Sequence, residues 1–137
     1  MSGAPAGPLA SFEVVVDPQE VAAFNAALGL PAMAAPPPTF AIRFLFHPAA
    51  RAALAAHAPA DGTLPIHIGQ RFRYHRALRP GERLICALSA LPADAGRAFA
   101  LLRLELSTPS GDTVGVAESE IVMAAPGQAW DKREAGR

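Results

Sequence analysis

The spacing of apolar and polar residues divides the chain into a helical first part and a strand-rich second part. Residues 12–16 are mostly β-branched, which predicts a short strand. Asp17 and Pro18 suit the N-cap and first turn of a helix, which is expected to end at Gly29. From residue 66 onward the apolar period changes from about 3.6 to about 2, as in half-buried strands. The strands expected there are 66–77, 83–91, 97–108 and 113–123.

The segment 39–57 is apolar on nearly every face, and a helix of this composition is expected to be buried. Apart from His57 at its end, its few polar residues recur at i, i+4 spacing and would form one narrow stripe. They are Thr39, Arg43, His47 and Arg51. Pro48 is expected to kink this long helix or to split it into two pieces.

Successive strands joined by short turns predict an antiparallel meander, to which the early strand is added. A buried helix must be wrapped, and a curled sheet is the remaining element that can wrap it. The expected fold is therefore α+β, a hot-dog fold in which a long central helix is held by a curved antiparallel sheet of about five strands. One such sheet leaves an open edge, so a dimer or pseudo-dimer that shares the sheet edge to edge is expected.

The length of 137 residues fits one domain, expected at 12–123 between a flexible N-terminal lead, 1–11, and a mobile tail, 124–137. Lys and Arg number 12, as do Asp and Glu, so no basic excess favours a nucleic-acid partner. Polar residues interrupt the most apolar stretch, so no membrane span is expected. The lone Cys86 fits a reducing compartment, and the N-terminus resembles no secretory signal, so we expect a cytoplasmic protein.

The histidines lack the spacing of a metal site, and no metal is expected. His47 lies on the polar stripe, where it is either a catalytic group or a histidine hydrogen-bonded at the edge of the core. His67 lies near the start of a strand. It either faces the mouth of a pocket or is simply a residue at a strand end. Cys86 is expected to be a small buried hydrophobe and not a nucleophile.

Arg71 and Arg73 share one face of their strand with His75, opposite Phe72 and Tyr74. This face is either a solvated outer surface or a cationic mouth for a phosphate-bearing group, such as coenzyme A or a phosphopantetheine carrier. Arginine suits the second role because its planar guanidinium donates two hydrogen bonds to phosphate at once.

The start of the long helix is a second candidate for ligand binding. Prolines 36–38 have no N–H, so Thr39, Phe40 and Ala41 are the first backbone donors. Such donors can polarise a thioester carbonyl, while the apolar interface of helix and sheet holds an acyl tail. The alternative is an ordinary helix that begins at proline and needs no ligand.

Three segments resemble the N-terminal-type domain of MaoC-like dehydratases. They are Pro-Pro-Thr-Phe at 37–40, Pro-Ile-His-Ile-Gly-Gln-Arg-Phe-Arg-Tyr-His-Arg at 65–76, and Leu-Arg-Pro-Gly-Glu at 78–82. The helix ending in Phe-Asn-Ala-Ala-Leu-Gly at 24–29 is similar to the Tyr-Ala-x-x-x-Gly helix of that family. The resemblance covers about residues 12–123, and Tyr74-His75-Arg76 with the turn after it is its most specific part.

The resemblance implies a paired hot-dog fold that binds acyl thioesters and interconverts trans-2-enoyl and (R)-3-hydroxyacyl forms. Catalytic members use an Asp and a His in a Gly-Asp-x-Asn-Pro-x-His motif, one to handle water and the α-proton and one to orient it. After Gly29 this chain continues Leu-Pro-Ala-Met-Ala-Ala, and Arg43 is the one ionisable residue between Asn25 and His47. Neither catalytic residue is carried over, so no catalytic residue is predicted.

We therefore expect a non-catalytic subunit that shapes the acyl pocket while a hot-dog partner supplies the Asp and His. Its ligand is an acyl-CoA or acyl-carrier thioester, with no other cofactor. The expected substrate-binding residues are Thr39, Phe40, Ala41, His47, His67, Arg71 and Arg73. One alternative is a stand-alone homodimer that binds acyl thioesters without turnover. Another is a hot-dog acyl-CoA thioesterase, although no acidic residue lies between Glu20 and Asp61 to serve it.

Overall fold

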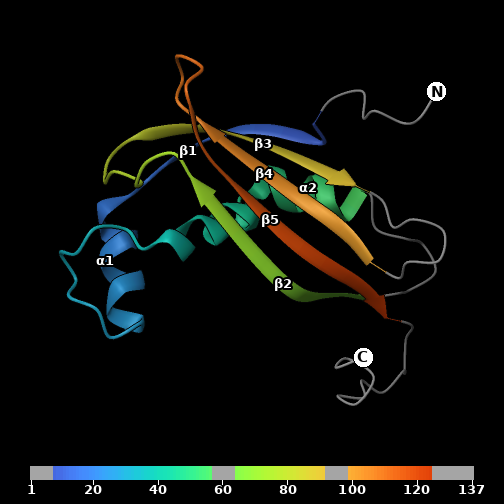
Figure 1. Cartoon of the computed structure of the whole chain (residues 1–137), viewed down its shortest axis with the longest axis horizontal. Helices are drawn as coiled ribbons and strands as arrows, with labels where there is room; N and C mark the ends of the chain where they lie inside the picture. The colour runs from blue at the N-terminus through green and yellow to red at the C-terminus, as the bar shows by residue number, and fades with distance from the viewer. Residues whose placement is uncertain (1–7, 57–63, 92–98, 125–137) are drawn as a thin grey trace.

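In a computed structural model of the chain, residues 8–56, 64–91 and 99–124 are described. One antiparallel sheet curls around the helical segments (Figure 1). Its strands are β1 (Ala10–Val15), β2 (Leu64–Tyr74), β3 (Arg83–Leu91), β4 (Phe99–Ser107) and β5 (Thr113–Ala124). The helices are α1 (Pro18–Ala27), the 3-10 helix η1 (Pro38–Phe46) and α2 (Pro48–Ala56). The end of the helix predicted at 39–57, the connection between the strands predicted at 83–91 and 97–108, and most of the predicted lead and tail lie outside the described residues.

Helix α1 begins and ends where the sequence predicts. The Asp17 side chain accepts a hydrogen bond from the Gln19 N–H at 2.8 Å, and Pro18 occupies the first turn. Gly29 follows the helix with a φ of 76°, a left-handed conformation that residues with a Cβ rarely adopt. The signals at both ends therefore act as expected.

The division expected at Pro48 is confirmed, whereas the expectation of a helix buried on nearly every face with one polar stripe is wrong. The segment divides into η1 and α2, because proline lacks an N–H and pushes the residue before it out of the helical region. His47 accordingly has φ −59° and ψ 141°. With three residues per turn in η1 and a break after it, the polar positions no longer form one stripe. In α2 the buried residue is Ala50, and Phe46 at the end of η1 is 68% exposed.

The strand order is β1-β3-β4-β5-β2, so the predicted four-strand meander is only partly right. Strands β3, β4 and β5 follow one another as expected, but β2 pairs with β5 and not with β3. A turn lies at 79–82 between the strands expected at 66–77 and 83–91, yet it does not close a hairpin. It binds the end of β1 instead, since the Gly81 N–H donates to the Val16 carbonyl at 2.6 Å and the Val16 N–H to the Glu82 carbonyl at 2.9 Å.

Arg76 and Glu82 hold that connection in place. The Arg76 guanidinium donates two hydrogen bonds to the Glu82 carboxylate, at 3.0 and 2.7 Å. The same carboxylate accepts the Arg79 N–H at 2.6 Å. Because the pair is bidentate and mostly shielded from water, it fixes the path by which the chain crosses from β2 to β3.

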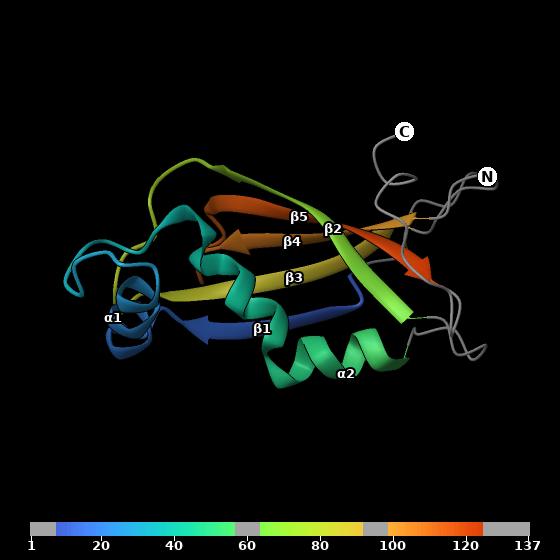
Figure 2. The same ribbon diagram turned by 90° about the horizontal axis from the view of Figure 1, so that it is seen from below.

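The core lies between the inner face of the sheet and η1. The alternation predicted for β3 and β4 is confirmed over 84–88 and 103–107, where buried residues alternate with more exposed ones. The inward residues of these strands are Leu84, Cys86, Leu88, Leu104 and Leu106. Phe40, Ala41 and Phe44 of η1 pack against the same core. Figure 2 shows the helices on one side of the sheet, and α2 contacts β1.

Strand β2 does not alternate throughout, because a β-bulge shifts its register between His67 and Gly69. Gly69 pairs with Glu120, whereas His67 pairs with Ile121, the next residue along β5. Residues paired across an antiparallel ladder share a face, and β5 itself alternates. The bulge therefore turns His67 to the inner face, while Arg71 and Arg73 stay on the outer one.

Candidate functional site

The N-terminal end of η1 contacts the end of β2 through Tyr74. Its hydroxyl donates a hydrogen bond to the Pro38 carbonyl. The Phe40 N–H donates to the Pro37 carbonyl at 2.9 Å, so it is not the free donor that the sequence predicts. Phe40 and Ala41 are fully buried and Thr39 is exposed. Tight 3-10 turns use backbone donors early, which leaves this end less open to a ligand than an α-helix end would be.

Burial raises the pKa of Tyr74 to about 12. Tyr74 also depends on a glycine, because a Cβ at Gly115 would lie 2.8 Å from both the Arg73 carbonyl oxygen and the Tyr74 ring. Glycine at this position lets β5 approach β2 closely and leaves room for the phenol. The join between η1 and the sheet is thus built from Pro38, Tyr74 and Gly115.

Aromatic rings extend this join into the core. The rings of Phe24 and Phe40 meet edge to face at 5.3 Å, and those of Phe40 and Phe44 at 6.0 Å. The Arg43 guanidinium lies over the Phe40 ring at 5.7 Å and reaches Glu20 at 3.8 Å. The one acidic side chain that pairs with η1 in the described part of the chain is therefore engaged with an arginine.

His47 caps α2. Its Nδ1 accepts the Ala49 N–H at 3.0 Å, and its ring stacks on Phe12 with centroids 4.5 Å apart. The imidazole thus acts as an acceptor for the first turn of α2. Of the two roles considered for His47, the geometry matches the hydrogen-bonded residue at the edge of the core.

The inner face of β2 carries polar groups near its bulge. The Ser119 hydroxyl donates to Gln70 Oε1 at 2.5 Å, and Ser119 is 2% exposed. Gln70 Nε2 is buried and has no hydrogen-bond partner among the described residues. His67 lies on the same face and is exposed. This surface thus offers an amide donor and an imidazole.

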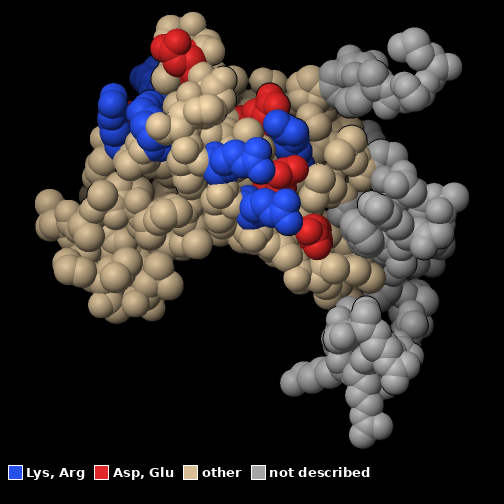
Figure 3. Space-filling view, in the orientation of Figure 1, with Lys and Arg blue, Asp and Glu red and all other residues tan. Residues whose placement is uncertain are grey.

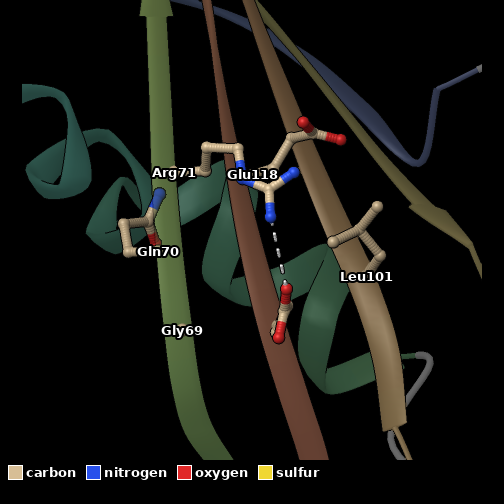
Figure 4. Close-up of a pocket in the computed structure, with 6 residues that line it drawn as sticks. Gly69, Gln70, Arg71, Leu101 and Glu118 are labelled. Atoms are coloured by element: carbon tan, nitrogen blue, oxygen red, sulfur yellow. Dashed lines mark ion pairs between the residues drawn. The ribbon is translucent and has the colours of Figure 1, made fainter.

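Arg71 and Arg73 lie on the opposite, outer face. Arg71 reaches Glu120 at 4.0 Å, and Arg71 and Arg73 are both exposed. Acidic and basic side chains are intermixed over the sheet in Figure 3. A shallow pocket of about 200 Å³ on this face is lined by Gly69, Gln70, Arg71, Leu101, Glu118 and Glu120 (Figure 4). Its size and its paired charges suit neither an acyl chain nor a phosphate.

The structure therefore divides the predicted site residues into separate groups. Thr39, Phe40 and Ala41 lie at the start of η1, and His67 lies on the inner face of β2. The arginines are on the other side of the sheet, where they cannot share a pocket with the inner residues. The role of these residues in binding a substrate stays a prediction.

Sequence reasoning missed Tyr74, Gln70 and Ser119 as members of the inner surface. Ser119 lies on the buried side of β5, at a position where the alternation of the strand predicts an apolar residue. By simple alternation Gln70 and His67 would lie on opposite faces of β2. Only the bulge places both side chains on the inner face.

Within the described residues no three His, Cys, Asp or Glu side chains gather as a metal site would require. No helix of the described part is long and apolar enough to span a membrane.

Comparison with known proteins finds no matching family and no matching curated sequence. Solved structures do match. The HadBC (3R)-hydroxyacyl-ACP dehydratase complex of Mycobacterium tuberculosis aligns over 81% of this chain and 90% of its own, with TM-score 0.69 and 15% identity. HtdX of the same organism has TM-score 0.67 and 20% identity, over 88% of this chain and 54% of HtdX. A thioesterase superfamily member of Thermus thermophilus has TM-score 0.64 and 22% identity, over 98% and 91%.

These likenesses establish the fold. The chain has an α+β hot-dog fold, in which a five-stranded antiparallel sheet curls around helical segments.

Proposed function

We propose that this chain is an accessory subunit of a hot-dog hydratase or dehydratase of MaoC-like type, which binds acyl thioesters but lacks a complete active site. The dehydratase complex and the thioesterase that share its fold support the acyl-thioester part of the proposal. The first of them is a complex of hot-dog subunits, which supports a partner chain.

The observation that carries the proposal is the chemistry of the segment between α1 and η1. Residues 26–38 contain no ionisable side chain, although the resemblance places the catalytic Asp and His there. The buried Asn25 holds this segment, since its Nδ2 donates to the Ala34 carbonyl at 2.9 Å and to the Ala32 carbonyl at 3.5 Å. A fixed apolar segment has nothing to move a proton, so the acid and base must come from another polypeptide.

The inner surface of β2 supplies what a pocket wall needs. Gln70 and Phe72 are only partly buried there, whereas Leu84, Cys86 and Leu88 on the inner face of β3 are fully buried. The unpartnered Nε2 of Gln70 is a donor for a carbonyl oxygen of the ligand, and Phe72 provides apolar surface.

Binding is tested by thermal unfolding of the isolated chain with crotonyl-CoA, a longer enoyl-CoA and free coenzyme A. A ligand that binds only the folded state raises the unfolding temperature as its concentration rises. We expect a shift with the acyl forms that Gln70→Glu reduces, because it keeps the side-chain shape but removes the amide donor. Arg51→Glu, on the exposed face of α2, is the control and should leave the shift unchanged. No shift with any acyl-CoA would contradict the proposal.

The second candidate is a homodimer that binds acyl thioesters without any catalytic partner. The observation that favours it is the unpaired edge of β2, which a second copy could occupy. This candidate predicts a stable homodimer that binds crotonyl-CoA, so sedimentation of the isolated chain distinguishes it from the accessory subunit.

A further inference from the structure

Ser119 is a buried hydroxyl on a mostly apolar face of the sheet. It is 2% exposed and lies on the inner face of β5, between Ala117 and Ile121 on that face. Its register partners in the neighbouring strands are Gln70 of β2 and Leu102 of β4. A buried hydroxyl needs a hydrogen-bond partner, and Gln70 is the one polar side chain among these four neighbours.

The hydrogen bond between the two side chains fixes the direction of the Gln70 amide. The Ser119 hydroxyl donates to Gln70 Oε1 at 2.5 Å. A hydroxyl has one proton to donate, and Oε1 is the acceptor that it meets, so the oxygen end of the amide is held against β5. The nitrogen end, with its two N–H groups, is thereby left for another acceptor.

That acceptor is missing among the described residues. Gln70 Nε2 is buried and has no hydrogen-bond partner there. Figure 4 shows the side chains of Gln70 and Arg71 pointing to different sides of β2. The next residue on the inner face is the partly buried Phe72. An unpaired amide donor beside an aromatic ring suits a carbonyl oxygen that is attached to an alkyl chain.

We propose that Ser119 is a positioning residue, which presents the Gln70 amide to the carbonyl oxygen of a bound acyl thioester. The inner surface of β2 then recognises the thioester group itself and not only the apolar chain. This inference rests on the proposed function and deepens it, because it names the ligand atom that is recognised and the residue that acts behind Gln70. A ligand without an oxygen at this place leaves Nε2 unpaired and is rejected for that reason.

His67 is the other polar group of this inner surface, and it is less suited to the role. It is exposed, and within the described residues no hydrogen bond holds its ring. A donor that is held in place before the ligand arrives loses less conformational entropy on binding than one that is free to turn. The selectivity is therefore assigned to the pair of Ser119 and Gln70.

Two coenzyme A derivatives separate the carbonyl oxygen from the rest of the ligand. Butyryl-CoA and S-butyl-CoA carry chains of equal length, but the second is a thioether and has no carbonyl oxygen. The dissociation constants of both for the folded chain are measured by isothermal titration calorimetry. We expect butyryl-CoA to bind about tenfold more tightly, because the thioether leaves Gln70 Nε2 without an acceptor.

Ser119→Ala should lower this ratio to less than about threefold, since the amide is then free to turn. Ser119→Thr keeps the hydroxyl and should restore most of the ratio. In a Gln70→Glu background, where the amide donor is gone, Ser119→Ala should change the ratio no further. A purely structural role of Ser119 would instead weaken the binding of both ligands equally and leave the ratio as it is in wild type.

Ser89→Ala is the matched control, since it makes the same substitution on the outer face of β3 and should keep the wild-type ratio. Circular dichroism establishes that each variant is folded. Should Ser119→Ala not fold, the ratios of wild type and Gln70→Glu still test the assignment.

Equal binding of the two ligands to wild type, or an unchanged ratio in a folded Ser119→Ala, would overturn the inference. The proposed function would stand in both cases, because it requires only that an acyl-CoA binds. If neither ligand binds the folded chain, the inference and the proposed function both fail.

Discussion

Cys86 is the one thiol of the chain, and its environment makes it unreactive. It is fully buried on the inner face of β3, and burial raises its pKa to about 12. A thiol reagent such as DTNB should therefore react very slowly with the folded chain at pH 8. In denaturant the same reagent should react rapidly with one thiol per chain. Rapid reaction of the folded chain would mean that the inner face of β3 is open to solvent.

Tyr74 is also single in the sequence, so its titration can be followed directly by absorbance at the tyrosinate band. Burial raises its pKa to about 12, and its hydroxyl is hydrogen-bonded to the Pro38 carbonyl. We expect no tyrosinate in the folded chain near the ordinary pKa of about 10. Ionisation at that lower pH, with the far-UV circular dichroism unchanged, would show that η1 does not hold Tyr74 against β2.

Gly115 is the residue on which that contact depends. Gly115→Ala would place a Cβ 2.8 Å from the backbone oxygen of Arg73, and backbone cannot move aside as a side-chain end can. We expect a loss of about 1–3 kcal/mol in the free energy of unfolding, measured by urea denaturation. The control is Ala87→Ser on the outer face of β3. Gly111→Ala is a poor match, because Gly111 has open space around it but a φ of 98°. An unfolding curve of Gly115→Ala equal to wild type would show that the strands are farther apart.

His47 acts as a cap in the structure, and a cap can be exchanged. His47→Asn keeps an acceptor for the Ala49 N–H, whereas His47→Ala removes it. We expect His47→Ala to cost about 1 kcal/mol in the free energy of unfolding and His47→Asn less than half of that. Equal losses in both variants would assign the stability to the stacking of the ring on Phe12 instead.

At the scale of elements, the connection from β2 to β3 depends on the ionised Glu82. Burial by itself would raise the pKa of this carboxyl, but hydrogen bonds from the Arg76 guanidinium and the Arg79 N–H outweigh it and hold the pKa below its usual value. A depressed pKa contributes stability above the ordinary pKa of about 4.3, and that stability is lost as pH falls through the lower, folded value.

Glu82→Gln should therefore lower the free energy of unfolding at pH 7 and flatten its fall below about pH 4.3. Urea denaturation of both proteins from pH 7 to pH 3 measures the two slopes. Glu105→Gln is the control, since its pair with Arg103 is exposed at 46% and 55%. Parallel curves for Glu82→Gln and wild type would remove Glu82 from the acid sensitivity of the fold.

The sequence predicts elements well where one local signal decides them, and poorly where distant contacts do. Asp17, Pro18 and Gly29 mark the ends of α1, and the period of two locates β3 and β5. The division of 39–57 at Pro48 was predicted from the proline, whereas no local signal in the sequence indicated the 3-10 geometry of η1.

The bulge in β2 illustrates the same limit. Gly69 inside the strand is the one local signal of a bulge, whereas strict alternation by itself places His67 with the arginines. The pairing of β2 with β5 decides otherwise and moves this one side chain to the other face. Which side of the sheet a candidate residue occupies is therefore a property of the ladder and not of the strand alone.

At the scale of the whole molecule, the prediction of a curved five-stranded sheet around a helix is confirmed, and a single sheet covers only part of the helical segment. The sheet covers one side of η1 and leaves Phe46 exposed, so this end of η1 is not covered by the sheet. The lack of ionisable side chains at 26–38 can be read from the sequence, because it is an absence of residue types. The distribution of Arg71 and His67 over two faces cannot, because strand order and register decide it.

The central claim is that this chain has the surface for an acyl thioester but not the groups to transform it. Its most direct test is the hydration of crotonyl-CoA by the purified, folded chain alone, followed as loss of the enoyl-thioester absorbance. The account predicts a rate equal to that of buffer, unchanged in His47→Ala and His67→Ala. A rate well above buffer that falls in either variant would contradict it, because the chain would then carry its own base.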